Sequence, residues 1–136
     1  MVRYSHQITK QKQPKQRFYL RFFTGGFKMS VITFVCAGQM NSAITFPAFE
    51  NGHEVRLVGS PLDRDIIDGL KKDNFHITLK RTLHDGIKYY QIEELEEALK
   101  GADLVLGGVS SFGLDWFCDE ILPVLPEDVP VLTVTK

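Results

Sequence analysis

The 136-residue chain has little cysteine, a single tryptophan and no long hydrophobic run. Its two cysteines, Cys36 and Cys118, lie in apolar stretches without metal-ligand spacing. This usage excludes a disulfide framework, predicts reduced, buried thiols in a cytoplasmic protein, and assigns no metal. The apolar runs are only as long as strands, so the sequence also excludes a membrane span.

Acidic residues are absent from residues 1–28, which hold 7 of the 16 Lys and Arg residues, whereas the rest of the chain holds 9 of them against 17 Asp and Glu. A basic arm for nucleic acid and a transit peptide both suit this composition. We favour a third interpretation, in which translation starts at Met29, because the codons of Thr24–Gly26 can encode a ribosome-binding sequence. Residues 1–28 are therefore predicted to be a disordered or untranslated leader, and residues 29–136 to form one domain with no nucleic-acid partner.

From Met29 onwards, short β-rich runs alternate with helical ones, which is typical of an α/β domain with a parallel sheet. Residues 31–35 form a continuous apolar run, as expected for a central strand buried on both faces. We expect a helix over 40–51 that Pro47 kinks or shortens and that ends at Gly52. The alternation over 53–58 predicts a second strand.

A second helix is predicted to start with Ser60 as its N-cap and Pro61 at its first position. Its apolar face would comprise Leu62, Ile66, Ile67 and Leu70. Asp85-Gly86 favours a hairpin turn between two extended stretches. The remaining pattern predicts helices over 93–100 and 112–122 and strands over 102–109 and 131–135.

The turn between the first strand and its helix reads "VCAGQMNSA". Such a turn binds a diphosphate through unpaired helix amides, and three glycines allow the tight turn, the approach of phosphate and helix packing. Here these positions are Cys36, Gly38 and Asn41, so the phosphate-approach glycine is kept. Cys36 suits its position if its φ is negative, whereas Asn41 would push the helix outward or reorient its first turn.

Four segments, the turn itself, "NGHEVRLVGS", "EELEEALKGADLVLGGVSS" and "VLPEDVPVLTVTK", follow in an order that resembles the N-terminal domain of NAD(P)-dependent glycerol-3-phosphate dehydrogenase. The resemblance covers Val31 to Lys136 and implies a Rossmann-type fold truncated before a helical substrate domain. It implies hydride transfer between NAD or NADP and glycerol 3-phosphate or dihydroxyacetone phosphate. Because the family's catalytic lysine belongs to that second domain, we assign no catalytic residue, and we expect the chain alone to be inactive and to bind substrate only with a second domain.

The resemblance also carries over cofactor positions. Gln39 and Met40 replace a serine and a tryptophan of the family turn, Ser60 replaces an arginine at the adenosine end, and Val109-Ser110 borders the nicotinamide half. Lys136 matches a lysine near both cofactor and substrate. The expected cofactor-binding residues are Cys36, Ala37, Gly38, Gln39, Met40, Asn41, Ser60, Val109, Ser110 and Lys136, with Lys136 also binding substrate.

Alternatives stay open at this point. The turn also resembles that of pyrroline-5-carboxylate reductase, and a non-catalytic nucleotide-binding or orphan fragment would share the same pattern. The helix N-terminus is able to lower the pKa of the Cys36 thiol, although a cysteine beside an apolar strand is commonly inert. His53 and His84 are expected in exposed turns, and His76 without partner ligands. Uncovered apolar surface makes a homo-oligomer plausible.

Overall fold

The computed structural model describes residues 29–135, so the predictions for residues 1–28 and for Lys136 lie outside the described residues. Five strands form one sheet in the order β5-β2-β1-β6-β7, and every pair in it is parallel. They are β1 (Val31–Val35), β2 (Glu54–Val58), β5 (Lys88–Tyr90), β6 (Leu104–Gly107) and β7 (Val131–Thr133). The predicted α/β class with a Rossmann-type parallel sheet is confirmed.

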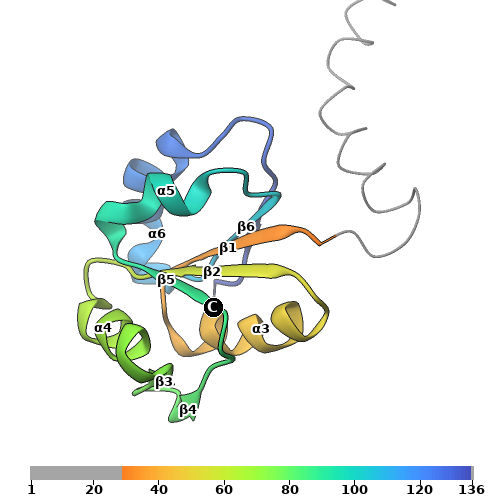
Figure 1. The fold of residues 1–136 in the computed structure, drawn as a ribbon. Helices are drawn as coiled ribbons and strands as arrows, with labels where there is room; N and C mark the ends of the chain where they lie inside the picture. The colour runs from red at the N-terminus through yellow and green to blue at the C-terminus, as the bar shows by residue number, and fades with distance from the viewer. Residues whose placement is uncertain (1–28, 136) are drawn as a thin grey trace, which may run out of the picture.

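Helices cover both faces of this sheet (Figure 1). α3 (Gln39–Glu50) and α4 (Arg64–Asp73) lie on one face, and η1 (Ile92–Glu94) with α5 (Leu95–Leu99) lies on the other. Beside α5 follow short helical turns, namely η2 (Ser111–Gly113), α6 (Leu114–Trp116), η3 (Phe117–Ile121) and η4 (Leu122–Val124). They occupy the place of the single helix predicted over 112–122.

The core consists of two apolar clusters that are separated by the sheet. Alternate residues of β1 point to opposite faces, so Phe34 packs in the cluster beneath α3 and α4 and Val35 packs beneath α5. The buried hydroxyl of this strand, Thr33 Oγ1, donates a 2.7 Å hydrogen bond to the Ala98 carbonyl. β1 is therefore buried on both faces, as its continuous apolar run predicts.

The predicted hairpin is wrong in its location. The antiparallel pair is β3 (Phe75–His76) with β4 (Arg81–Thr82), and its turn lies at 77–80 rather than at Asp85-Gly86. Asp85-Gly86 instead forms a turn that leads into β5, which joins the main sheet beside β2. Lys80 takes the left-handed conformation, with φ 54°, so the hairpin turn uses a residue that carries no turn signal.

The start of α4 also differs from its prediction. The N-cap residue is Asp63, not Ser60, and Leu62 is 94% exposed rather than part of the apolar face. The Asp63 N–H donates to the Ser60 carbonyl, which closes a turn before the helix begins. α3 is not shortened by Pro47, contrary to that part of the expectation, and continues to Glu50. Gly52 follows it with φ 84°, as expected for its helix end.

Candidate functional site

The candidate site lies where the sheet order reverses. The chain runs outward from β1 to β2 and β5, and then returns to β6 on the other side of β1. In open parallel sheets, ligands bind at the carboxyl ends of the strands at this switch point. The turn 36–38 after β1 and residues 108–110 after β6 are the two segments that flank it.

The N-terminus of α3 is open to a ligand. Gly38 is the N-cap, no side chain caps it, and no acidic residue lies in the first turn. The first intrahelical bond joins the Ser42 N–H to the Gly38 carbonyl at 3.0 Å. The helix therefore presents partial positive charge and unpaired amides at this edge, which is the requirement for holding a phosphate.

Glycines at this edge differ in what they do for the protein. A Cβ on Gly59 would meet Ile67 at 2.6 Å, one on Gly107 would meet Phe117 at 2.8 Å, and one on Gly108 would meet Asn41 at 2.4 Å. These three glycines are required by packing. A Cβ on Gly38 would meet only the Gly108 carbonyl at 3.9 Å, and its φ is −66°, so packing and backbone conformation leave the absence of a side chain there unexplained.

The Asn41 side chain is accommodated at the start of α3, which begins directly after Gly38. This side chain is fully buried over Gly108, and its Nδ2 donates to the carbonyls of Val35 (2.9 Å) and Cys36 (2.8 Å). The Oδ1 atom of this amide is buried without a hydrogen-bond partner among the described residues. Asn41 thus replaces the third fingerprint glycine by using space that Gly108 leaves directly after the neighbouring strand, β6.

Cys36 does not have the negative φ that was expected of it. Its φ is 79°, in the left-handed region. Its thiol is buried, and burial, followed by the nearby Asp63 carboxylate, raises the pKa of Cys36 to about 12. The idea that the helix N-terminus lowers this pKa is therefore wrong, and the thiol is not a nucleophile at neutral pH. Cys118 is exposed, so its predicted burial is wrong.

Four of the expected cofactor-binding residues have buried side chains, and five reach the surface. Buried are Cys36, Ala37, Asn41 and Val109; partly or fully exposed are Gly38, Gln39, Met40, Ser60 and Ser110. Met40 is 59% exposed, and Ser110 occupies an N-cap position without a side-chain hydrogen bond, so both side chains are free to contact a ligand. The structure brings all of these except Ser60 to the β1–β6 switch point.

Two residues that sequence reasoning missed hold the turn. Asp63 Oδ2 accepts the Ala37 N–H at 3.0 Å and the Ser60 N–H at 2.8 Å. His76, which is fully buried, forms a 2.7 Å hydrogen bond to the Ala37 carbonyl. The position of Asp63 before a helix was a usable signal, but nothing in the sequence around His76 indicates contact with a turn 39 residues away.

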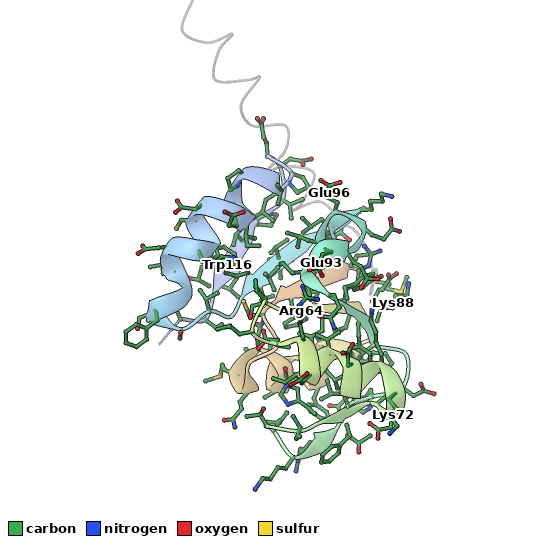
Figure 2. All side chains as sticks on the ribbon, turned by 90° about the vertical axis from the view of Figure 1, so that its left-hand side faces the viewer. Arg64, Lys72, Lys88, Glu93, Glu96 and Trp116 are labelled. Atoms are coloured by element: carbon green, nitrogen blue, oxygen red, sulfur yellow. The ribbon has the colours of Figure 1, made fainter. Side chains whose placement is uncertain are left out.

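A surface ion pair fixes the neighbouring loops. Arg64, the first residue of α4, pairs with Glu93 of η1, and Figure 2 shows the two side chains directed toward one another. Lys71 pairs with Glu94 at 2.8 Å on the same side. Both pairs are exposed, so they order the surface more than they stabilise the fold.

No known protein-family profile matches the chain. Among curated proteins, the chain is 34% identical over 102 residues to an NADP(+)-dependent glycerol-3-phosphate dehydrogenase from Archaeoglobus fulgidus, which covers 75% of this chain and 30% of that protein. Over these 102 residues, the chain is homologous to this dehydrogenase. It spans about a third of the length of this dehydrogenase.

Solved structures agree on the fold of this homologue. The glycerol-3-phosphate dehydrogenase of Coxiella burnetii superposes with a TM-score of 0.70 at 20% identity, over 79% of this chain and 33% of that one. The Saccharomyces cerevisiae enzyme gives 0.63 at 14% identity, over 80% and 34%. A ketopantoate reductase from Ralstonia eutropha gives 0.54 at 21% identity, over 77% and 34%. The predicted resemblance to glycerol-3-phosphate dehydrogenase is confirmed, and these structures show that it extends to the fold.

Proposed function

We propose that this chain is the nicotinamide-dinucleotide-binding domain of a glycerol-3-phosphate dehydrogenase-like oxidoreductase. The observation that carries the proposal is Gly38, the glycine at the switch point that packing does not require. Its missing side chain leaves open the approach to the uncapped amides of α3. NADP is favoured over NAD as the first ligand to test because the curated homologue is NADP(+)-dependent.

In this proposal the diphosphate is held by the backbone amides at 38–40, with Gln39 and Met40 beside it. Ser60 lies toward the adenosine half, and Val109, through its backbone, and Ser110 lie toward the nicotinamide half. Lys136, outside the described residues, keeps its proposed contact with cofactor and substrate. When bound, the dinucleotide supplies the hydride chemistry.

Among the described residues, the exposed candidates at this edge offer no group for proton transfer. The exposed candidates Gln39, Met40, Ser60 and Ser110 carry neither an acid nor a base at neutral pH, and Asp63 is engaged by two amides. We therefore propose that substrate, which is glycerol 3-phosphate or a similar small molecule, is bound and converted only when further parts of a dehydrogenase complete the site. An assay showing efficient glycerol 3-phosphate oxidation by the 136-residue chain would contradict this.

Binding is tested by titrating the purified chain with NADPH and NADH and following coenzyme fluorescence. We expect a saturable change. The Gly38→Ala variant should weaken binding about tenfold because its Cβ enters the phosphate approach, while its free energy of unfolding stays within about 0.5 kcal/mol of wild type. Gly69→Ala, in α4, is the matched control, because its Cβ would make only an ordinary 3.5 Å contact with the Phe75 carbonyl.

The titration also separates this proposal from an orphan fragment. No saturable change with either coenzyme at millimolar concentration would overturn the proposed function. Equal dissociation constants for Gly38→Ala, Gly69→Ala and wild type would show that binding, if present, does not use this turn.

A further inference from the structure

The peptide groups on either side of Ala37 are held from opposite directions by two side chains of a later segment. Asp63 Oδ2 accepts the Ala37 N–H at 3.0 Å, and His76 Nε2 lies 2.7 Å from the Ala37 carbonyl oxygen. Ala37 and His76 are both fully buried. The His76 contact is therefore buried away from water, whereas the contact with the partly exposed Asp63 is part-buried.

The hydrogen bonds of the imidazole determine its tautomer. The Leu79 N–H donates to His76 Nδ1 at 3.0 Å, so Nδ1 is the acceptor and the ring proton is on Nε2. Nε2–H then donates to the Ala37 carbonyl. Both ring nitrogens of a neutral histidine are thus satisfied, and the imidazole links the β3–β4 hairpin to the turn after β1.

A second contact joins the same two segments. Gln39 Nε2, in the first turn of α3, donates to the Thr78 carbonyl at 3.0 Å. The hairpin therefore contacts the turn both before and after Gly38. These are contacts to the segment that would carry the diphosphate, rather than to the distant part of α3.

The turn needs such support because Cys36 replaces a glycine. Its φ of 79° lies in a region that side-chain-bearing residues disfavour, and it must persist for the amides of 38–40 to face one direction. The residue directly after it, Ala37, is the one that Asp63 and His76 hold. We call this pair of contacts, from Asp63 and His76 to Ala37, the clamp. If Cys36 relaxed to a negative φ, the peptide after it would move first, and this is the peptide that the clamp holds.

We propose that His76, together with Asp63, is a positioning residue for dinucleotide binding, which holds the turn 36–38 in its binding conformation in place of the missing glycine. This inference rests on the proposed function. His76 contacts no ligand in this account. It raises the fraction of molecules whose turn is competent to bind, and the apparent dissociation constant follows that fraction.

The test is a cycle of four proteins: wild type, His76→Phe, Cys36→Gly and the double variant. Phenylalanine keeps an aromatic ring, although a larger one, and removes both hydrogen bonds. We expect His76→Phe to weaken NADPH binding about tenfold when residue 36 is cysteine and less than about threefold when it is glycine, because glycine adopts positive φ without cost. The free energy of unfolding should fall by a similar amount in both backgrounds, since the Ala37 carbonyl loses its partner in each.

The matched control is His84→Phe. His84 packs against the rings of Phe46 and Phe49 and pairs with Glu50, away from the turn. This variant should leave NADPH affinity unchanged. His76→Gln, whose amide can still donate to the Ala37 carbonyl, should stay within about threefold of wild type, and it carries the test if His76→Phe does not fold.

The outcomes are distinguishable. Failure of wild type to bind either coenzyme overturns the proposed function. Binding by wild type, with equal losses from His76→Phe in the wild-type and Cys36→Gly backgrounds or with no loss in either, overturns the clamp alone. Long-range ¹H–¹⁵N NMR of wild type gives an independent reading: an Nε2–H tautomer for His76 supports the clamp, and an Nδ1–H tautomer contradicts it.

Discussion

At the scale of single residues, the turn after β1 keeps its shape although two fingerprint glycines are replaced. Each replacement is compensated by a different partner: Cys36 by the contacts on Ala37, and Asn41 by the empty space at Gly108. Asn41 also satisfies two carbonyls at the end of β1. The loss of two fingerprint glycines is therefore accommodated locally, and the helix still begins directly after Gly38.

At the scale of single residues, the sequence predicts one position of the candidate site but not the contacts that hold it. The fingerprint spacing identifies Gly38 without any structure. It cannot give the sign of φ at Cys36, and it cannot pair Asn41 with Gly108 or Ala37 with His76, because these contacts join residues 39 to 67 positions apart that no periodicity connects. Such contacts depend on how the elements pack, which a local pattern does not contain.

The Asn41–Gly108 contact gives a direct stability prediction. A Cβ in Gly108→Ala would lie 2.4 to 2.8 Å from atoms of the Asn41 side chain, so both must move. We expect a loss of about 1–3 kcal/mol in the free energy of unfolding, measured by urea denaturation. Asn41→Gly in the same chain should remove most of the clash, so the double variant should be more stable than the sum of the single effects allows. Additive effects would contradict direct contact.

The raised pKa of Cys36 predicts a contrast between the two thiols. At pH 8, a thiol with a pKa of about 12 is ionised in only about one molecule in 10⁴, whereas Cys118 is exposed. Iodoacetamide should therefore alkylate Cys118 and leave Cys36 intact in the folded protein, as read by peptide mass spectrometry. Equal rates of labelling would show that the thiol at residue 36 is accessible.

The same shift has a consequence for stability. Because the folded state holds the Cys36 proton more tightly than the unfolded state does, this thiol's contribution is complete below pH 9 and is lost as the pH rises from 9.0 toward 12. Cys36→Ser should flatten the decline of the free energy of unfolding across that range, when measured by urea titration at each pH. Tyr89, whose pKa burial raises to about 12, titrates in the same window and remains in both proteins.

At the scale of elements, α3 and four of the five parallel strands, β1, β2, β6 and β7, lie close to their predicted positions, whereas β5 was expected in a hairpin. Buried strands and amphipathic helices were found by their periods, since alternation and apolar runs reflect local burial. The errors fall in the segment between α4 and β5 and at the start of α4. There Asp63 uses its carboxylate to join two loops, and the hairpin is fixed by contacts of His76 and Gln39 with the turn.

Replacing Pro47 in α3 should make the protein more stable. The proline lies inside a continuous 12-residue helix and is exposed, so it removes one helical hydrogen bond without a visible packing gain. Pro47→Ala should raise the free energy of unfolding by about 1–3 kcal/mol, less a few tenths for the more flexible unfolded chain. Pro126→Ala, in a loop, is the control and should give no gain. An unchanged urea midpoint for Pro47→Ala would mean that the helix already relaxes around the ring.

At the scale of the whole molecule, the sheet order explains why distant residues form one site. Residues 36–40 and 108–110 are separated by the entire β2-to-α5 segment, yet β1 and β6 are neighbours in the sheet and both end at the same edge.

No helix among the described residues is long and apolar enough to cross a membrane. Within residues 29–135, no group of three or more His, Cys, Asp and Glu side chains could hold a metal ion.

The sheet order also predicts which residues change their NMR signals when a coenzyme binds. Saturation with NADPH should shift backbone amide NMR signals at 36–41, 59–60 and 108–110, and leave residues 47–50 at the far end of α3 unchanged, because only the former lie at the carboxyl edge. Linkage sets the accompanying stabilisation: at 100 times the dissociation constant, unfolding should cost about 2.7 kcal/mol more. Gly38→Ala, if it binds tenfold more weakly, should lose about half of that gain at the same coenzyme concentration, which leaves about 1.4 kcal/mol. Shifts centred on 47–50 or on β5 would place the ligand elsewhere, because neither segment borders the reversal in strand order between β1 and β6.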